Sequence, residues 1–179
     1  MQQGNISYEL VKKRVKNLSI RVRPDGTVLV TIPYHMSRKR AMEFVDSKYE
    51  WILTKTQQME ERIHIDVDAL KWNADKENYL KQIFDEQYQI FSSYGIPYPQ
   101  LKFRKMKGRY GSCNTTTKVV TLNKALVDMP IECAEYVAAH ELAHLIQANH
   151  SKAFYQVLDV VMPDHRIREK RLKNYALHN

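Results

Sequence analysis

The stretch His140-Glu141-Leu142-Ala143-His144 is the most informative part of the chain for both its fold and its chemistry. Two histidines four residues apart on a helix lie on one face, one turn apart, so both imidazoles can reach the same metal ion. Glu141 lies between them and cannot easily bind that ion, but its carboxylate can hold a water molecule beside it. This is the arrangement of the H-E-x-x-H motif of zinc hydrolases. Residues 135–139 contain no Gly or Pro, so they are compatible with a helix that leads into the motif.

A third histidine, His150, follows His144 at the spacing of the extended motif H-E-x-x-H-x-x-G-x-x-H. The spacing predicts that His140, His144 and His150 bind one zinc ion per chain and that Glu141 is the catalytic general base. Gln147 stands where the extended motif has Gly. We therefore expect a helix one turn longer, with Asn149 turning the chain, because Asn tolerates left-handed geometry at a helix end.

Composition and charge limit the classes of protein to which the chain can belong. Its 179 residues, 44% of them hydrophobic, suffice for one good core with a small annex. No apolar run is long enough to span a membrane, and residues 1–5 show no secretory signal. With only two cysteines, Cys113 and Cys133, a reduced, cytoplasmic protein is expected. We expect Cys113 to be a small packing residue rather than a metal ligand or nucleophile.

The net charge of +8 makes an acidic partner plausible, nucleic acid among them. The basic residues are spread along the chain, which fits an ordinary solvated surface slightly better than a binding stripe. No base-reading motif is visible, so any nucleic-acid association is predicted to be nonspecific and to involve phosphates.

The first part of the chain predicts a small N-terminal βα unit over residues 1–65. Alternating apolar residues over 6–32, with a turn at Pro24–Thr27, indicate antiparallel β structure. Ser37 is a candidate cap for one helix over about 38–62. Residues 63–73 lack periodicity and are interpreted as a linker.

The second part of the sequence indicates a domain over residues 74–179 that contains both helices and strands. We expect a long helix over about 74–94, strands at 101–106 and 119–122 paired as a hairpin, and the motif helix from about Asp128. A helix capped by Ser151 and a basic terminal helix over about 164–175 follow. The fold class is therefore α+β.

The segment Arg109-Tyr110-Gly111-Ser112 precedes the motif by more than twenty-five residues. Since the hairpin needs a cover for its apolar face and the motif helix is the nearest candidate, we expect residues 109–113 to form a wall of the active-site cleft. Gly111 would admit a substrate backbone. These four residues are the candidates for substrate binding. The candidates for oxyanion support are Arg109, Tyr110, Tyr155 and His165.

The segments R-Y-G-S-C at 109–113, H-E-L-A-H at 140–144, H-S-K with Phe154, and Pro163-Asp164 together resemble the YgjP-like metallopeptidase family. That family is related to the WLM and SprT-like zincins. The resemblance implies a zincin-like core of antiparallel strands plus the motif helix, with zinc ligands at His140, His144 and His150 and Glu141 as base. Two positions depart from the family pattern: Tyr110 replaces a Trp, and His165 stands where Tyr is common.

The sequence thus predicts a zinc metallopeptidase that hydrolyses peptide or protein substrates and has no membrane association. Two alternatives stay open. One is a nucleic-acid-associated protein, for DNA-linked protein processing or binding, with a regulatory or structural zinc site. The other is a zinc amidase that acts on a small molecule. The salt dependence of DNA binding tests the first alternative, and cleavage of casein against small amides tests the second.

Overall fold

The structure, a computed structural model, describes residues 6–23 and 25–178. Pro24 of the predicted turn and residues 1–5, where a secretory signal was sought, lie outside the described residues, as does Asn179. The chain divides into two compact units, Met1–Arg62 and Ile63–Asn179. Both combine helices and strands, which confirms the α+β class. None of the helices in the described ranges is both long and apolar enough to cross a bilayer.

The first unit holds a three-stranded sheet of β1 (Tyr8–Lys13), β2 (Ser19–Val22) and β3 (Val28–Pro33), in the order β1-β3-β2. The predicted hairpin is confirmed, because β2 pairs antiparallel with β3. The antiparallel prediction is wrong for β1, which runs parallel to β3. The chain crosses from β1 to the far edge before β3 returns between the two strands. The central place goes to β3, whose apolar residues Val28, Val30 and Ile32 are all buried.

The single helix predicted over 38–62 is two helices, α1 (Arg38–Ser47) and α2 (Tyr49–Glu60), separated at Lys48. The Ser37 side chain caps α1 as predicted, accepting a hydrogen bond from the Arg40 N–H. The Ser47 hydroxyl donates to the Phe44 carbonyl at 2.7 Å. Such local bonds compete with the helical backbone bonds, which accounts for a break at this place.

The second unit contains the sheet β5 (Gln100–Arg104), β7 (Val119–Asn123) and β6 (Gly111–Asn114), in the order β5-β7-β6. The predicted hairpin of 101–106 with 119–122 is wrong, because β5 and β7 pair in parallel. The antiparallel partner of β7 is β6. Its short turn explains this, since Asn114 Oδ1 accepts the N–H groups of Thr116 and Thr117 and Lys118 adopts a φ of 53°.

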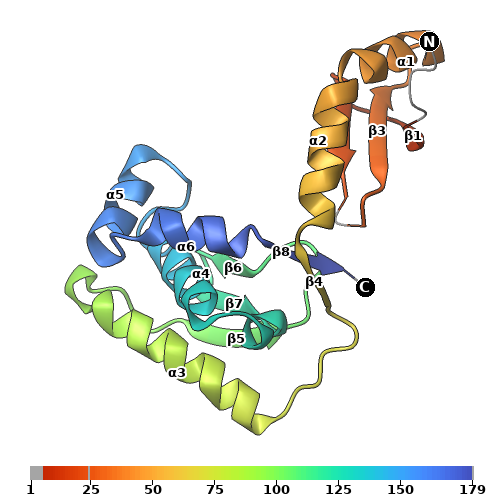
Figure 1. The fold of residues 1–179 in the computed structure, drawn as a ribbon. Helices are drawn as coiled ribbons and strands as arrows, with labels where there is room; N and C mark the ends of the chain where they lie inside the picture. Colours follow the sequence, from red (N-terminus) through yellow and green to blue (C-terminus); the bar gives the residue numbers. More distant parts are fainter. Residues whose placement is uncertain (1–5, 24, 179) are drawn as a thin grey trace. The chain divides into compact units, whose positions relative to one another are not determined.

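Helix α4 (Ile131–Ala143) is the centre of this unit, and Figure 1 shows it among the sheet and the other helices. It packs against α3 (Ala74–Ile90), α5 (Lys152–Val161), α6 (His165–Leu172) and β6. Short 3₁₀ turns, η1 (Ser92–Tyr94) and η2 (Lys124–Asp128), follow α3 and precede α4. The long helix expected from residue 74 thus ends its α-helical part at Ile90, and Gly95 closes η1 with a positive φ.

The predicted linker and the predicted end of the terminal helix form a second, two-stranded sheet. Strand β4 (Ile63–Asp66) pairs in parallel with β8 (Tyr175–His178). The linker interpretation is therefore wrong for 63–66, and the terminal helix ends at Leu172. Burial of Ile65, Ala176 and Leu177 favours the strand pair, because pairing also satisfies the backbone groups that accompany these side chains into the core.

Asn123, at the end of β7, holds the segment that leads into β6. Its buried amide donates to the carbonyls of Met106 at 2.6 Å and Arg109 at 2.9 Å and accepts from the Ala125 N–H at 3.0 Å. Its backbone N–H donates to the Tyr110 carbonyl at 2.8 Å. Every polar atom of this side chain is thus paired, and the pairs determine the path of residues 106–110.

We expect Asn123→Ala to lower the free energy of unfolding by about 3 kcal/mol, because buried carbonyls and an N–H lose their partners. The control is Asn114→Ala, which removes two side-chain hydrogen bonds, against three for Asn123→Ala, but at an exposed position, and should cost about 1 kcal/mol or less. Urea denaturation followed by Trp72 fluorescence, with Trp51→Phe in both proteins, measures this. Equal losses in the two variants would contradict the role of Asn123.

Candidate active site

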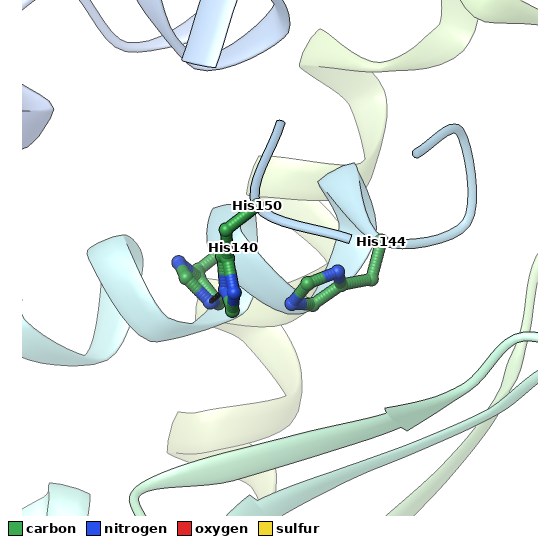
Figure 2. Close-up of side chains that lie close together, drawn as sticks. All are labelled: His140, His144 and His150. Carbon is green, nitrogen blue, oxygen red and sulfur yellow. Dashed lines mark hydrogen bonds between the residues drawn. The ribbon is translucent and has the colours of Figure 1, made fainter. Parts of the chain in front are cut away.

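Three histidines converge at the end of α4. His140 lies in its last turn, His144 is the residue directly after it, and His150 lies in the loop before α5. One ring nitrogen from each lies within 4.8 Å of the others. The Nε2 atoms of His140 and His150 are 3.0 Å apart. Figure 2 shows the three rings turned toward one another.

The spacing of these nitrogens fits a metal ion. In a tetrahedral zinc site with ligand bonds of 2.0–2.1 Å, neighbouring nitrogens lie roughly 3.3 Å apart. The other nitrogen of two rings has a partner: His144 Nδ1 lies 3.2 Å from the Gln147 carbonyl, and His140 Nδ1 lies 3.5 Å from the Tyr136 hydroxyl. Such partners hold the Nδ1–H tautomer and leave Nε2 free to bind a metal.

The end of α4 and the path of the chain after it differ from the prediction. The helix ends at Ala143 rather than one turn later, and the Leu145 and Ile146 N–H groups bond to the carbonyls of Leu142 and Ala143, three residues back. Among the described non-glycine residues, only Lys118 has a positive φ, so the prediction of left-handed geometry at Asn149 is wrong. A tightened last turn redirects the chain, and it also brings the Gln147 carbonyl to His144.

Phe154, on α5, contacts all three rings of the histidine cluster. Its buried ring lies with its centroid 5.0 Å from that of His140, 4.7 Å from His144 and 4.8 Å from His150. The sequence pattern identified Phe154 only as part of an apolar helix face. Its contact with all three histidines depends on how α5 folds back on α4.

Burial shifts the protonation of His140 toward the neutral form. Desolvation, followed by the neighbouring His144 and His150, lowers the pKa of His140 to about 4. Burial lowers the pKa of His144 as well. Neutral imidazole is the form that binds a metal, so both residues are ready as ligands at neutral pH.

Glu141 lies against Gly111, at the start of β6. It is only 6% exposed, and burial raises its pKa to about 7, with Arg109 opposing the shift. A Cβ atom on Gly111 would lie 2.6 Å from Glu141 Oε1 and 2.8 Å from Val137 Cγ1. The absent side chain at Gly111 therefore makes room for Glu141, whereas the sequence pattern predicts room for a substrate backbone there.

A cleft of ≈330 Å³ opens beside Glu141 and His140. Arg109, Tyr110 and Gly111 line it, so these segments lie together as expected, and their substrate binding stays a prediction. Ser112 does not reach this cleft and lines a separate hollow with Lys102 and Thr121. Cys113 packs against the core, where burial and the nearby Glu141 raise its pKa to about 11, consistent with a packing residue.

Two of the four candidates for oxyanion support are engaged elsewhere. The Tyr110 hydroxyl donates to the Tyr175 carbonyl at 2.8 Å. His165 is 1% exposed, and its Nε2 lies 2.9 Å from Asp159 Oδ1. Tyr155, 40% exposed with its ring 6.5 Å from that of His150, and Arg109 on the cleft remain accessible.

Sequence reasoning missed five residues that line the cleft: Tyr136, Val137, Glu169, Leu172 and Lys173. The first two precede His140 and Glu141 by one helical turn, so the helical period was a sufficient signal for them. The other three come from α6, and nothing local in the sequence places α6 beside the motif.

The family model described as YgjP-like, metallopeptidase domain, matches residues 16–92 and 66–175. No curated protein matches the chain. Among solved structures it is similar to the metallopeptidase zymogen abylysin of Pyrococcus abyssi, with 22% identity, a TM-score of 0.46, and coverage of 52% of this chain and 90% of that one. It is also similar to the metallopeptidase zymogen jannalysin of Methanocaldococcus jannaschii, with 26% identity, a TM-score of 0.44, and coverage of 52% and 92%. Because the matched residues span most of the chain, this protein belongs to the YgjP-like metallopeptidase family.

Proposed function

We propose that this metallopeptidase uses one zinc ion, held by His140, His144 and His150, and that Glu141 is its general base. The observation that carries the proposal is the convergence of three imidazole nitrogens within 4.8 Å of one another, with His140 lining the same cleft as the buried Glu141. The substrates we propose are peptides or proteins.

The donor set supports zinc. Three neutral imidazoles suit zinc and other late transition metals better than calcium or magnesium, which prefer oxygen. Three protein ligands with one open position are typical of catalytic zinc. The chemistry that zinc supplies when bound is Lewis acidity, which polarises a carbonyl and lowers the pKa of water from about 15.7 to about 7.

Glu141 supports proton transfer at this place. A general base works best when its pKa lies near the operating pH, and burial raises the pKa of this carboxyl to about 7. Its carboxylate oxygen would take a proton from the attacking water and pass it to the leaving amine nitrogen. Gly111 leaves space for Glu141 Oε1, because a side chain at residue 111 would overlap that oxygen.

We expect the purified wild type to contain about one zinc per chain and His144→Ala to lose most of it, because two nitrogen donors cannot complete the site. Elemental analysis of protein purified without chelator measures this. His35→Ala, at an exposed histidine of the first unit, is the control and should keep its zinc. Absence of zinc from the wild type, or its retention in His144→Ala, would contradict the ligand assignment.

Glu141→Gln should keep zinc and lose hydrolysis by about 10²–10⁴-fold, the usual contribution of a general base. Gln has a similar shape but cannot accept the proton. The measurement is casein cleavage, with metal content determined on the same samples. Wild-type cleavage by this variant would mean that Glu141 is structural.

Gly111→Val should reduce peptide cleavage far more than zinc content, because the nearest atoms that a Cβ there would meet belong to Glu141 and Val137. Gly108→Val is a matched control three residues away, where a Cβ meets nothing within 4 Å. Undiminished cleavage by Gly111→Val would show that the contact with Glu141 does not matter for catalysis.

The same cleavage assay separates the peptidase from a zinc amidase for small molecules. A peptidase hydrolyses casein and leaves small amides largely intact, since they cannot use binding energy from neighbouring residues. Faster turnover of small amides than of peptides would favour the amidase.

Association with nucleic acid is a separate proposal, supported by the net charge of +8 and by the ≈550 Å³ hollow that Lys102 and Arg104 line together with hydroxyl side chains. We expect binding, where it occurs, to fall steeply with salt and to show no sequence preference. Titration of labelled duplex DNA at several salt concentrations measures this, with Lys102→Ala/Arg104→Ala expected to flatten the salt dependence. Strong sequence preference, or binding that survives high salt, would contradict it.

A further inference from the structure

We infer that the ≈330 Å³ cleft beside Glu141 binds one large apolar side chain of the substrate, next to the bond that is cleaved, and that Leu172 sets the size of side chain it accepts. The inference rests on the proposed peptidase function. It adds the class of substrate that the site prefers.

The position of the cleft indicates that a group bound in it lies next to the scissile bond. His140 and Glu141, a proposed metal ligand and the proposed base, belong to its lining. Since Glu141 must lie within hydrogen-bond reach of the atoms it serves, a substrate group that fills the cleft belongs to a residue flanking the scissile bond.

The walls of the cleft favour an apolar group. Val137 and Leu172 are 4% and 7% exposed and both line it. Two aromatic residues complete the walls, and their hydroxyls are already engaged: that of Tyr110 with the Tyr175 carbonyl, and that of Tyr136 near His140 Nδ1. An apolar side chain gains by leaving water here, whereas a polar one finds those groups occupied.

The charged residues at the rim do not offer a site for a charged side chain. Glu169 and Lys173 pair with each other at 2.6 Å, so their charges largely cancel. Arg109 lines the same cleft as the carboxyl of Glu141, so these opposite charges offset each other. A charged substrate group in the cleft would lose its hydration without a dedicated partner.

Leu172 lies on α6, and ion pairs attach this wall of the cleft to α4. Two ion pairs join α6 to α4, Arg168 with Glu135 and Arg171 with Glu132, and both lie within one turn of Leu172. A wall that cannot move aside discriminates by size, and one methylene in an apolar pocket changes the rate by about 10–200-fold. A change in the size of residue 172 should therefore change which substrate side chain the enzyme prefers.

The test uses synthetic peptides that differ only at the residues on either side of the bond that the wild type cleaves, with Gly, Leu, Phe, Trp, Asp or Lys there. At one of the two positions that flank the cleaved bond, the wild type should prefer Leu or Phe to Gly, Asp and Lys by roughly tenfold or more in kcat/KM. Leu172→Ala should raise the ratio of Trp to Leu substrates by roughly tenfold or more. Leu172→Val, a milder change, should shift the ratio in the same direction and decides the question where the Ala variant does not fold.

Leu158→Ala is the matched control, because Leu158 is also buried but lies on α5 outside the cleft lining. It should leave the ratio unchanged although it also removes core volume. An unchanged ratio in both Leu172 variants, or a wild-type preference for Asp or Lys, would overturn the inference.

Binding separates this inference from the proposed function. The same peptides, fluorescently labelled, are titrated onto zinc-loaded Glu141→Gln protein with Leu or Val at position 172, and anisotropy gives the affinities. A wild type that cleaves none of the peptides contradicts the peptidase proposal, while an apolar ranking that shifts with residue 172 still supports the cleft. Equal affinity for all side chains would overturn the assignment of the cleft.

Discussion

The burial of helix α4 on almost all its sides is the constraint on which the rest of this unit depends. From Cys133 to Ala139 every residue except Glu135 is buried. A helix that is apolar nearly all round is stable only inside a core, and its alanines let α3, α5 and α6 approach closely. The histidines therefore appear where this buried helix ends, and the functional groups are held by the best-packed element of the fold.

This burial acts in opposite directions on two neighbouring residues. It lowers the pKa of His140 to about 4 and raises that of Glu141 to about 7. Desolvation disfavours the charged form of either group, so burial favours the neutral form of both side chains, a shift that suits the metal-ligand and general-base roles proposed for them. His140 lies in the histidine cluster and Glu141 lies against Gly111, and both side chains line the same cleft.

The surroundings of α4 come from segments that are distant in sequence, and each is held by its own polar contacts. Asn123 holds residues 106–110 through their carbonyls. Ion pairs attach α6, and the Tyr110 hydroxyl joins the start of β6 to β8. Because the cleft lies among these three attachments, its shape depends on contacts that no single segment determines.

Local patterns in the sequence were sufficient for the parts whose causes lie within a few residues. The four-residue spacing of His140 and His144 follows from the helical period, Ser37 caps α1 because its hydroxyl reaches an N–H three residues on, and alternation over 19–32 marks one hairpin. The combined motifs also pointed to the family that the comparison confirms. Only the tertiary structure decided that β5 runs parallel to β7, that β4 pairs with β8, that Glu141 occupies the space at Gly111 and that α6 lines the cleft. The physical reason is that strand partners and burial are set by contacts between segments far apart in the chain, and side-chain periodicity describes one face of one element without naming what covers it.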